Sequence, residues 1–155
     1  IQSGAWIKSL YDLMSDGTVL LIDYGMTEAE YFHPQRVEGT LKCFSNHKSS
    51  DNPFIHIGKQ DITASVNFSN IASIAKDIGF KVSGYTTQSM FLISLGIENY
   101  LKNEQNEEKK LKIAQEIKQL VLPGAMGEVF KVMALSKKQS VKLEGFRELD
   151  LTSRL

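Results

Sequence analysis

The hydrophobic pattern at the start of the chain predicts an α-helix followed by a buried strand. Apolar side chains recur at helical spacing at Trp6, Leu10, Leu13 and Met14. Asp16-Gly17 then marks a helix end and a turn. Residues 18–23 form an unbroken β-branched and apolar run, which is typical of a strand buried on both faces of a parallel sheet. Together these patterns predict the first unit of an α/β fold.

The middle of the chain repeats this alternation of strand and helix. A helix is predicted between an N-cap at Ser69 and a left-handed residue at Gly79. Its apolar face comprises Ile71, Ile74, Ala75 and Ile78. Residues 80–85 are predicted to form a strand, and Thr86-Thr87 can cap a second helix that ends at Gly96.

The C-terminal third is predicted to hold one more helix and a terminal β-hairpin. The helix has an apolar face that comprises Leu111, Ala114, Ile117, Leu120 and Val121. Pro123-Gly124 ends this helix. Residues 129–135 and 141–146 are predicted to form two strands that a turn at residues 136–140 would join.

The segment between the first strand and the Ser69 helix is irregular. The strand ends at residues 23–25, after which Thr27 and Glu30 fit a capping box for a short helix. Residues 34–67 show no steady period apart from a short strand predicted at residues 39–44. A long irregular excursion inside a compact domain is more often functional than idle.

Composition limits the class of protein and the class of partner. The chain has 155 residues, of which 42% are hydrophobic, and this predicts one globular domain over residues 1–155. The 18 Lys and Arg residues balance the 18 Asp and Glu residues, so no net positive charge attracts nucleic acid or an anionic membrane. The longest apolar runs are far shorter than the roughly 20 residues of a membrane span. We expect neither nucleic acid nor membrane as a partner.

Cysteine and histidine usage argues against a disulfide and against a metal site. Cys43 is the only cysteine, so the chain can form no internal disulfide, and a reducing compartment is expected. We expect Cys43 to be a small buried hydrophobic residue. His33 and His56 have no cysteine or carboxylate at a recognisable metal-binding spacing, and we predict no metal site.

Several motifs occur in an order that resembles one protein family. They are Gly17-Thr-Val-Leu-Leu-Ile-Asp-Tyr-Gly25, Gly39-Thr-Leu-Lys-Cys-Phe44, Gln60-Asp-Ile-Thr63 with Val66-Asn-Phe68, Thr86-Thr-Gln88 followed by Phe91-Leu92, and Met126-Gly127 followed by Phe130-Lys131. The family is the MidA-like methyltransferases, which are related to a mitochondrial complex I assembly factor. The resemblance extends from about Trp6 to Ala134, which is nearly the whole chain.

The resemblance implies an S-adenosylmethionine-dependent methyltransferase (EC 2.1.1.-) with a class I, Rossmann-like fold. This chain would hold the later strands and helices of a mostly parallel sheet, together with the irregular excursion. Family members bind S-adenosylmethionine mainly through a glycine-rich strand-turn-helix upstream of the matching segment. No Gly-x-Gly pattern follows a predicted strand here, and the chain begins with Ile1 rather than methionine. We therefore expect a missing donor-binding part, no cofactor-binding residues, and no activity of this segment alone.

The resemblance also implies an acceptor and a location. Family membership suggests N-methylation of a protein arginine, with this segment on the substrate side of the cleft. The protein substrate would be a subunit of respiratory complex I or its bacterial counterpart. The protein would be cytoplasmic in a bacterium and would lie in the mitochondrial matrix in a eukaryote.

Four residues are candidates for the chemistry: Asp23, Glu30, Asp61 and His47. Asp23 lies beyond the end of a predicted strand, where open α/β sheets place ligands. A carboxylate can hold a guanidinium through paired hydrogen bonds, and Glu30 and Asp61 are the candidates for that role. His47 could accept or relay a proton. The plainer interpretations are loop hydrogen bonds for Asp23, helix capping for Glu30 and surface exposure for His47.

Six residues are candidates for substrate binding: Tyr24, Gly25, Glu28, Arg36, Thr40 and Gln88. A core side chain is the alternative for Tyr24, and a solvated acid is the favoured interpretation of Glu28. Arg36 and Gln88 lie within family motifs and could bind the target backbone or brace the excursion. Bracing is favoured for Gln88, because it lies in the first turn of a predicted helix.

The sequence departs from the family pattern at two positions. Asn67 stands where members often have aspartate, so no carboxylate role is carried over to it. Lys42 stands where arginine is common, which weakens a bidentate role, because only the guanidinium presents a planar fork of donors.

Two alternative functions stay open at the level of sequence. The chain could be a non-catalytic protein-binding or assembly module that lacks the donor site. It could also belong to an enzyme that methylates a small molecule, because the fold alone does not decide the substrate. If upstream strands are missing, the apolar residues 19–22 lose their cover, and we expect self-association.

Overall fold

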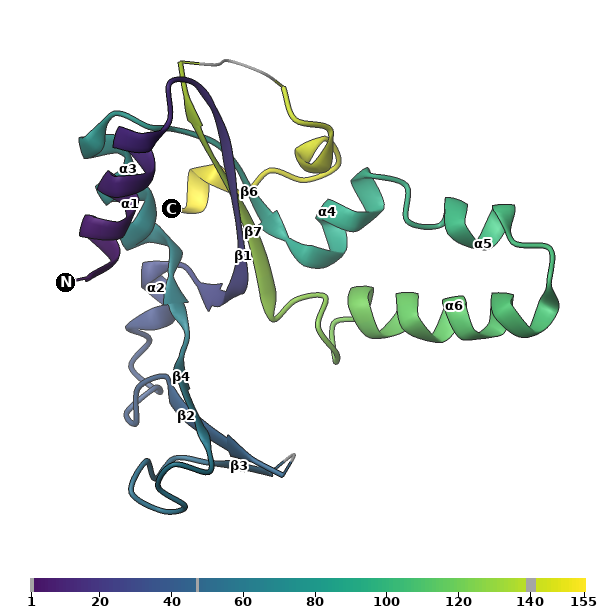
Figure 1. Ribbon diagram of the computed structural model, residues 1–155, viewed down its shortest axis with the longest axis horizontal. Helices are drawn as coiled ribbons and strands as arrows, with labels where there is room; N and C mark the ends of the chain where they lie inside the picture. Colours follow the sequence, from purple (N-terminus) through teal and green to yellow (C-terminus); the bar gives the residue numbers. More distant parts are fainter. Residues whose placement is uncertain (1, 47, 139–141) are drawn as a thin grey trace.

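The computed structural model describes residues 2–46, 48–138 and 142–155 and has a mixed α/β fold (Figure 1). Its centre is a four-stranded sheet in the order β5-β1-β7-β6. The strands are β1 (Gly17–Met26), β5 (Val66–Asn67), β6 (Lys81–Thr87) and β7 (Phe130–Lys137). β7 is antiparallel to both of its neighbours, whereas β1 and β5 are parallel. The predicted α/β class is confirmed, but the sheet of the described residues is mixed rather than mostly parallel.

Two helices cover one face of this sheet. α1 (Gln2–Leu13) and α3 (Phe68–Ile78) lie side by side (Figure 1). Ile7 and Phe68 are among the side chains that these helices bury against Met133 and Leu135 of β7. Lys137 fastens the end of α1 to the sheet, because its Nζ donates to the carbonyl oxygens of Tyr11 and Met14 at 2.6 Å each.

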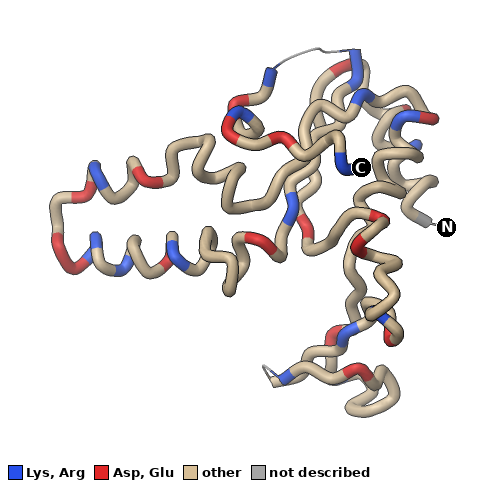
Figure 2. The backbone as a smooth tube through the Cα atoms, turned by 180° about the vertical axis from the view of Figure 1, so that it is seen from behind, with Lys and Arg blue, Asp and Glu red and all other residues tan. Residues whose placement is uncertain are grey.

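The opposite face is covered by α4 (Gln88–Ser94) and a 3-10 helix, η1 (Glu144–Phe146). The rings of Phe91 and Phe146, 5.4 Å apart between centroids, lie in this smaller core with Val132 and Ala134 of β7. α5 (Asn99–Asn103) and α6 (Glu107–Val121) form a hairpin that extends away from the sheet (Figure 1). Basic and acidic residues are interspersed along this hairpin and over the rest of the described chain (Figure 2).

β1 is not buried on both faces, in contrast to the sequence prediction. Leu20 is 48% exposed and Ile22 is 53% exposed. On the outer edge of β1, only Gly25 and Met26 pair with β5. Residues 17–24 therefore have no strand partner on that edge among the described residues, and the apolar run is covered on one face only.

The irregular excursion forms an arm with a sheet of its own. β2 (Leu41–Ser45) pairs antiparallel with β3 (Lys48–Ser50) and with β4 (Asp61–Ala64). The short helix α2 (Glu28–Tyr31) leads from β1 into the arm, and Ser65 alone separates β4 from β5 (Figure 1). Cys43 is 1% exposed, which confirms that it is a small buried residue.

The far edge of the main sheet is covered by the C-terminal segment. The N–H of Leu151 donates to the carbonyl oxygen of Tyr85 at 2.6 Å, and the N–H of Tyr85 donates to Oδ1 of Asp150 at 3.2 Å. The chain then ends in a second 3-10 helix, η2 (Thr152–Arg154). Both backbone groups of Tyr85 on the outer side of β6 are therefore satisfied from within the chain.

Local capping explains where the helices begin and end. Thr87 caps α4 as predicted, because its hydroxyl accepts the N–H of Met90 at 3.3 Å. Gly79 ends α3 with a φ of 114°, also as predicted. Ser69 was wrongly predicted as the N-cap of α3. That role belongs to Asn67, while the hydroxyl of Ser69 accepts the N–H of Glu28 at 2.9 Å.

The buried stripe of α1 differs from the predicted one by one position. Trp6 is 51% exposed and Leu13 is 85% exposed, whereas Ile7 is fully buried. Leu10 and Met14 do pack against the core, as predicted. The sequence offers two overlapping apolar stripes, and the sheet selects the one that begins at Ile7.

The predicted terminal β-hairpin is also wrong. Residue 141 lies outside the described residues, and residues 144–146 form η1 rather than a strand. β7 pairs with β1 and β6 instead. Phe146 covers the sheet instead. Its ring lies so close to Gly84 that a Cβ added to Gly84 would be 2.4 Å from the ring.

Candidate functional site

A hollow lies at the carboxyl end of β1, where β1, β5 and β7 meet. Its volume is ≈ 310 Å³. It is lined by Tyr24, Gly25, Met26, Glu30, Arg36, Ser65, Glu128, Val129 and Lys131. We call it the strand-end hollow. Open α/β sheets bind ligands at this kind of position.

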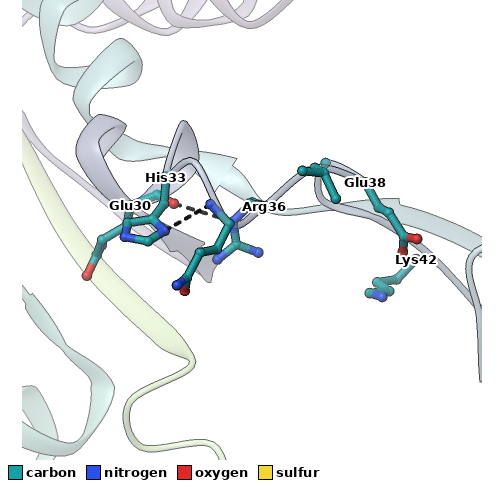
Figure 3. A pocket seen from close by; sticks show the side chains of 8 residues that line it. Glu30, His33, Arg36, Glu38 and Lys42 are labelled. Atoms are coloured by element: carbon teal, nitrogen blue, oxygen red, sulfur yellow. Dashed lines mark hydrogen bonds between the residues drawn. The ribbon is translucent and has the colours of Figure 1, made fainter.

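A second hollow, of ≈ 510 Å³, adjoins the first, because Glu30 and Arg36 line both. We call it the arm hollow, since it lies along the start of the arm. Glu30, His33 and Arg36 lie together at one side of it, and Glu38 and Lys42 lie at the other (Figure 3). The structure thus brings together four predicted site residues in and around these hollows: Tyr24, Gly25, Glu30 and Arg36.

Glu30 is held in place by the cap of α2. The N–H and the hydroxyl of Thr27 both donate to its Oε2, at 2.9 and 3.0 Å, as the predicted capping box requires. Among the described residues, no hydrogen bond reaches its Oε1. Partial burial raises the pKa of Glu30, but the hydrogen bonds from Thr27 and the cations Lys131 and Arg154 outweigh this effect and lower it below its ordinary value. Glu30 is therefore a carboxylate at neutral pH.

Tyr85 is a core residue whose hydroxyl is affected electrostatically by the charge of Glu30. Burial, and then the negative charge of Glu30, raise the pKa of Tyr85. Its side chain is 1% exposed, and its hydroxyl has no hydrogen-bond partner among the described residues.

Arg36 fixes the turn after α2. Its Nε donates to the carbonyl oxygen of Glu30 at 3.3 Å, and its N–H donates to the carbonyl oxygen of His33 at 2.8 Å (Figure 3). The N–H of Gln35 donates to Nδ1 of His33 at 3.3 Å. The guanidinium of Arg36 thus braces backbone at the border of the two hollows.

The end of β1 is shaped by three consecutive residues. Asp23 is exposed and its Oδ1 accepts the N–H of Tyr24 at 2.8 Å, which agrees with the plainer interpretation of Asp23. Tyr24 packs edge-on against Phe130, and burial followed by the charge of Asp23 raises its pKa. Gly25 has no room for a side chain, because a Cβ would lie 2.3 Å from the carbonyl oxygen of Val66.

Residues 1–86 of the chain match the family described as "Putative S-adenosyl-L-methionine-dependent methyltransferase". The chain belongs to this family. Two solved structures from Burkholderia thailandensis resemble it with 34% sequence identity over 98% of its length. One is a COG1565 superfamily member bound to S-adenosyl-homocysteine, with a TM-score of 0.93, and the other is a native COG1565 superfamily protein, with a TM-score of 0.94.

These findings confirm the MidA-like resemblance and the methyltransferase fold. The chain spans 40% and 41% of the lengths of the two solved proteins. No curated protein matches it.

The described part of this methyltransferase-family chain has no glycine-rich turn between a strand and a helix. Its strand-to-helix junctions lie at residues 26–28, 67–68 and 87–88, and none contains a glycine. A glycine-rich turn at such a junction is what lets a nucleotide-like ligand approach the backbone closely.

The described ranges contain neither a metal-binding cluster nor a membrane-spanning helix. No group of three or more His, Cys, Asp or Glu residues gathers there to hold a metal ion. None of the helices described is long and apolar enough to cross a bilayer.

Five of the predicted site residues that the structure describes line neither hollow, and Asp23 is one of them. Asp61 is exposed at the end of β4 that is farther from Ser65. Gln88 is buried and its Nε2 donates to the carbonyl oxygen of Leu120 at 2.9 Å, which agrees with a bracing role. Thr40 is buried beside Tyr31, and Glu28 is exposed. His47 lies outside the described residues.

Sequence reasoning missed two charged residues of the strand-end hollow. Lys131 lies opposite Asp23 in the β1–β7 ladder, and its Nζ donates to the carbonyl oxygen of Glu128. Burial lowers the pKa of Lys131, although the charges of Glu30 and Glu128 act in the other direction. The carboxylate of Glu128 accepts the hydroxyl of Ser89 at 3.3 Å. Phe130-Lys131 was already part of a family motif, and this was the signal that could have found Lys131.

Proposed function

We propose that the protein to which this chain belongs transfers a methyl group from S-adenosylmethionine to a guanidinium nitrogen of a protein arginine, and that this chain forms the acceptor side of the cleft. Family membership supports methyl transfer. A solved relative binds S-adenosyl-homocysteine, the compound that S-adenosylmethionine becomes when it loses its methyl group. The acceptor in this proposal is a respiratory complex I subunit or its bacterial counterpart.

One observation supports the arginine acceptor best: the ionised carboxylate of Glu30 lines two adjoining hollows at the end of β1. Thr27 occupies Oε2, while Oε1 has no partner among the described residues. A guanidinium presents planar N–H donors that match a carboxylate. Glu30 would therefore accept these donors and orient the acceptor nitrogen.

Lys131 would assist through its charge. A protonated guanidinium has no nucleophilic lone pair, so the acceptor must lose a proton before or during methyl transfer. Lys131 lines the strand-end hollow and is half-buried there. A cation at that position raises the free energy of a second positive charge and favours the neutral guanidine. Glu30 would thus orient the guanidinium and Lys131 would lower its pKa. The methyl group would pass from the sulfur of the donor to the nitrogen, S-adenosyl-homocysteine would leave, and the proton of the guanidinium would pass to solvent.

The test is labelling of cell-extract proteins by the complete protein with methyl-labelled S-adenosylmethionine. We expect labelled arginine, identified by mass spectrometry, and a drop of roughly 100-fold for Glu30→Gln, in the range seen when a positioned electrostatic group is removed. Glu116→Gln, in α6, is the matched control and should retain activity. Labelling of another residue type, or full activity of Glu30→Gln, would contradict the proposal.

A non-catalytic binding or assembly module is the second candidate. The absence of a glycine from the described strand-to-helix junctions favours it, because the usual turn for a nucleotide-like ligand is missing there. This alternative predicts that a partner is captured equally well with and without S-adenosylmethionine. It also predicts capture by an Asp23→Asn, Asp61→Asn variant. Capture that requires the donor would exclude it.

A further inference from the structure

The outer edge of β4 is a row of backbone groups without a strand partner. β4 is the last strand of the β3-β2-β4 sheet, so only one side of its backbone pairs with β2. Among the described residues, no other backbone–backbone hydrogen bond involves residues 61–65. Asp61, Ile62 and Ala64 are exposed. Such an edge can accept a further strand.

The edges of β6 and β3 are covered or protected, whereas residues 17–24 of β1 have no partner on their outer edge among the described residues. Asp150 and Leu151 cover β6. β3 has three residues and begins with a lysine, and both features discourage pairing. β5 occupies the edge of β1 beside the strand-end hollow. β4 has no lysine or proline among its four residues, and its one charged residue, Asp61, lies at the end farther from Ser65.

The β4 edge leads directly to the strand-end hollow. Ser65 follows β4 and lines that hollow together with Gly25 and Glu30. Ile62 lies three residues before Ser65 and is 57% exposed. Leu41 is 39% exposed and lies on the same face of the arm sheet, because Leu41 pairs with Ala64 and side chains alternate between faces. An apolar surface therefore accompanies the open edge toward the site.

We propose that the β4 edge binds an extended segment of the acceptor protein as an added strand, which places the target arginine in the strand-end hollow. This inference rests on the proposed function and names its substrate class. Backbone pairing supplies affinity in such complexes, and pockets for individual side chains supply specificity. A helical acceptor is excluded, because its backbone groups are already paired with one another.

The direction of pairing sets the substrate pattern. Antiparallel pairs are the commoner kind, and β2 and β4 already pair in this way. An antiparallel segment with its arginine beside Ser65 passes Ile62 on its C-terminal side. The preferred substrate is therefore an unfolded segment in which a large apolar residue follows the arginine within about four positions.

The decisive measurement is binding of the purified chain to fluorescein-labelled peptides of about twelve residues with this pattern. Two further probes carry N-methyl groups at alternate amides, so that one set of methyl groups faces β4 and the other faces away. We expect one methylated probe to bind about tenfold more weakly and the other to stay within about twofold of the parent peptide. Equal affinities of the two methylated probes would overturn the proposal.

A protein variant tests the same surface from the other side. Ile62→Thr keeps a β-branched residue in an exposed position and removes apolar surface beside the edge. Binding should weaken about fivefold. Ile57→Thr is the matched control, because Ile57 is 78% exposed in the arm but lies outside β4. Binding by this control should be unchanged.

Two reagents separate this inference from the proposed function: a peptide with citrulline in place of arginine, and the Glu30→Gln variant. If both weaken binding while the two methylated probes behave alike, the arginine site stands and the β4 edge is overturned. If the methylated probes differ but neither reagent has an effect, the edge stands and the arginine acceptor falls. If no peptide binds and Ile62→Thr changes self-association in sedimentation, the edge serves a second copy of the chain and the proposal fails.

Discussion

Both hydrogen-bond donors of Thr27 converge on one oxygen of Glu30, with the N–H at 2.9 Å and the hydroxyl at 3.0 Å from Oε2. Thr27→Val removes the hydroxyl and keeps the N–H. The pKa of Glu30 should therefore rise toward its ordinary value. Carbon-13 NMR of the Glu30 carboxyl measures this directly. Thr27→Ser keeps the donor and should leave the titration unchanged, and an unshifted pKa in Thr27→Val would contradict the assignment.

The lowered pKa of Glu30 also links folding to pH. The pKa of a glutamate in the unfolded chain is about 4.3. A lower pKa in the folded chain therefore contributes stability that is present above that pH and is lost as the pH falls through the folded pKa. Glu30→Gln should flatten the decline of the unfolding free energy between roughly pH 5 and pH 3. Urea unfolding at a series of pH values gives the comparison. Parallel declines in both proteins would show that Glu30 is not responsible.

Lys137 should be a major contributor to the docking of α1. Its Nζ donates to two carbonyl oxygens at the end of that helix and lies 3.8 Å from the ring centroid of Tyr11. Lys137→Met keeps most of the apolar stem and removes the charge. We expect a loss of about 1–3 kcal/mol in the unfolding free energy. Lys138→Met, at the exposed neighbouring position, should change it by less than about 0.5 kcal/mol.

Gly25 should tolerate no side chain, because β5 approaches it closely. A Cβ would lie 2.3 Å from the carbonyl oxygen of Val66 and 2.8 Å from the ring of Phe68. Gly25→Ala should therefore separate β1 from β5 and destabilise the fold by about 1–3 kcal/mol. Gly124→Ala meets nothing within 4 Å and should be nearly neutral. Thermal unfolding of the two variants side by side tests the difference.

Thr86 and Thr87 are neighbours with opposite expected responses to substitution. The hydroxyl of Thr86 is buried without a partner among the described residues, whereas that of Thr87 caps α4. Thr86→Val should stabilise the chain by about 1 kcal/mol, because it removes an unpaired polar group at nearly constant shape. Thr87→Val should destabilise it by about 1 kcal/mol. Urea denaturation that shows the same sign for both variants would contradict this account.

Local signals in the sequence predicted most helices and strands of the fold. The capping box of Thr27 and Glu30, the cap at Thr87 and the left-handed Gly79 all lie within a few residues of the element that they end or begin. Non-local pairing was harder to predict. The pairing of β7 with β1 joins residues more than 100 positions apart, and no local pattern distinguishes β7 from a strand of a terminal hairpin.

The candidate site shows the same difference between residues that local signals predict and residues that only the tertiary structure brings together. Tyr24, Gly25 and Glu30 could be predicted because they follow one strand directly in sequence. Ser65 and Lys131 reach the strand-end hollow from distant parts of the chain, so only the tertiary structure shows that they belong to it. Conversely, Asp61 was selected for its charge and motif, but its place in β4 holds it away from both hollows.

The single residue between β4 and β5 allows the arm to set a fixed spacing along a bound segment. Because Ser65 alone joins the two strands, a guest strand on β4 meets the main sheet at a fixed count of residues. Each residue of such a strand spans about 3.3 Å, so one inserted residue beside Ser65 would shift the selected position along the guest by about one place. In the proposed complex, selection would depend more on the position of the arginine relative to its neighbours than on the identity of any one neighbour.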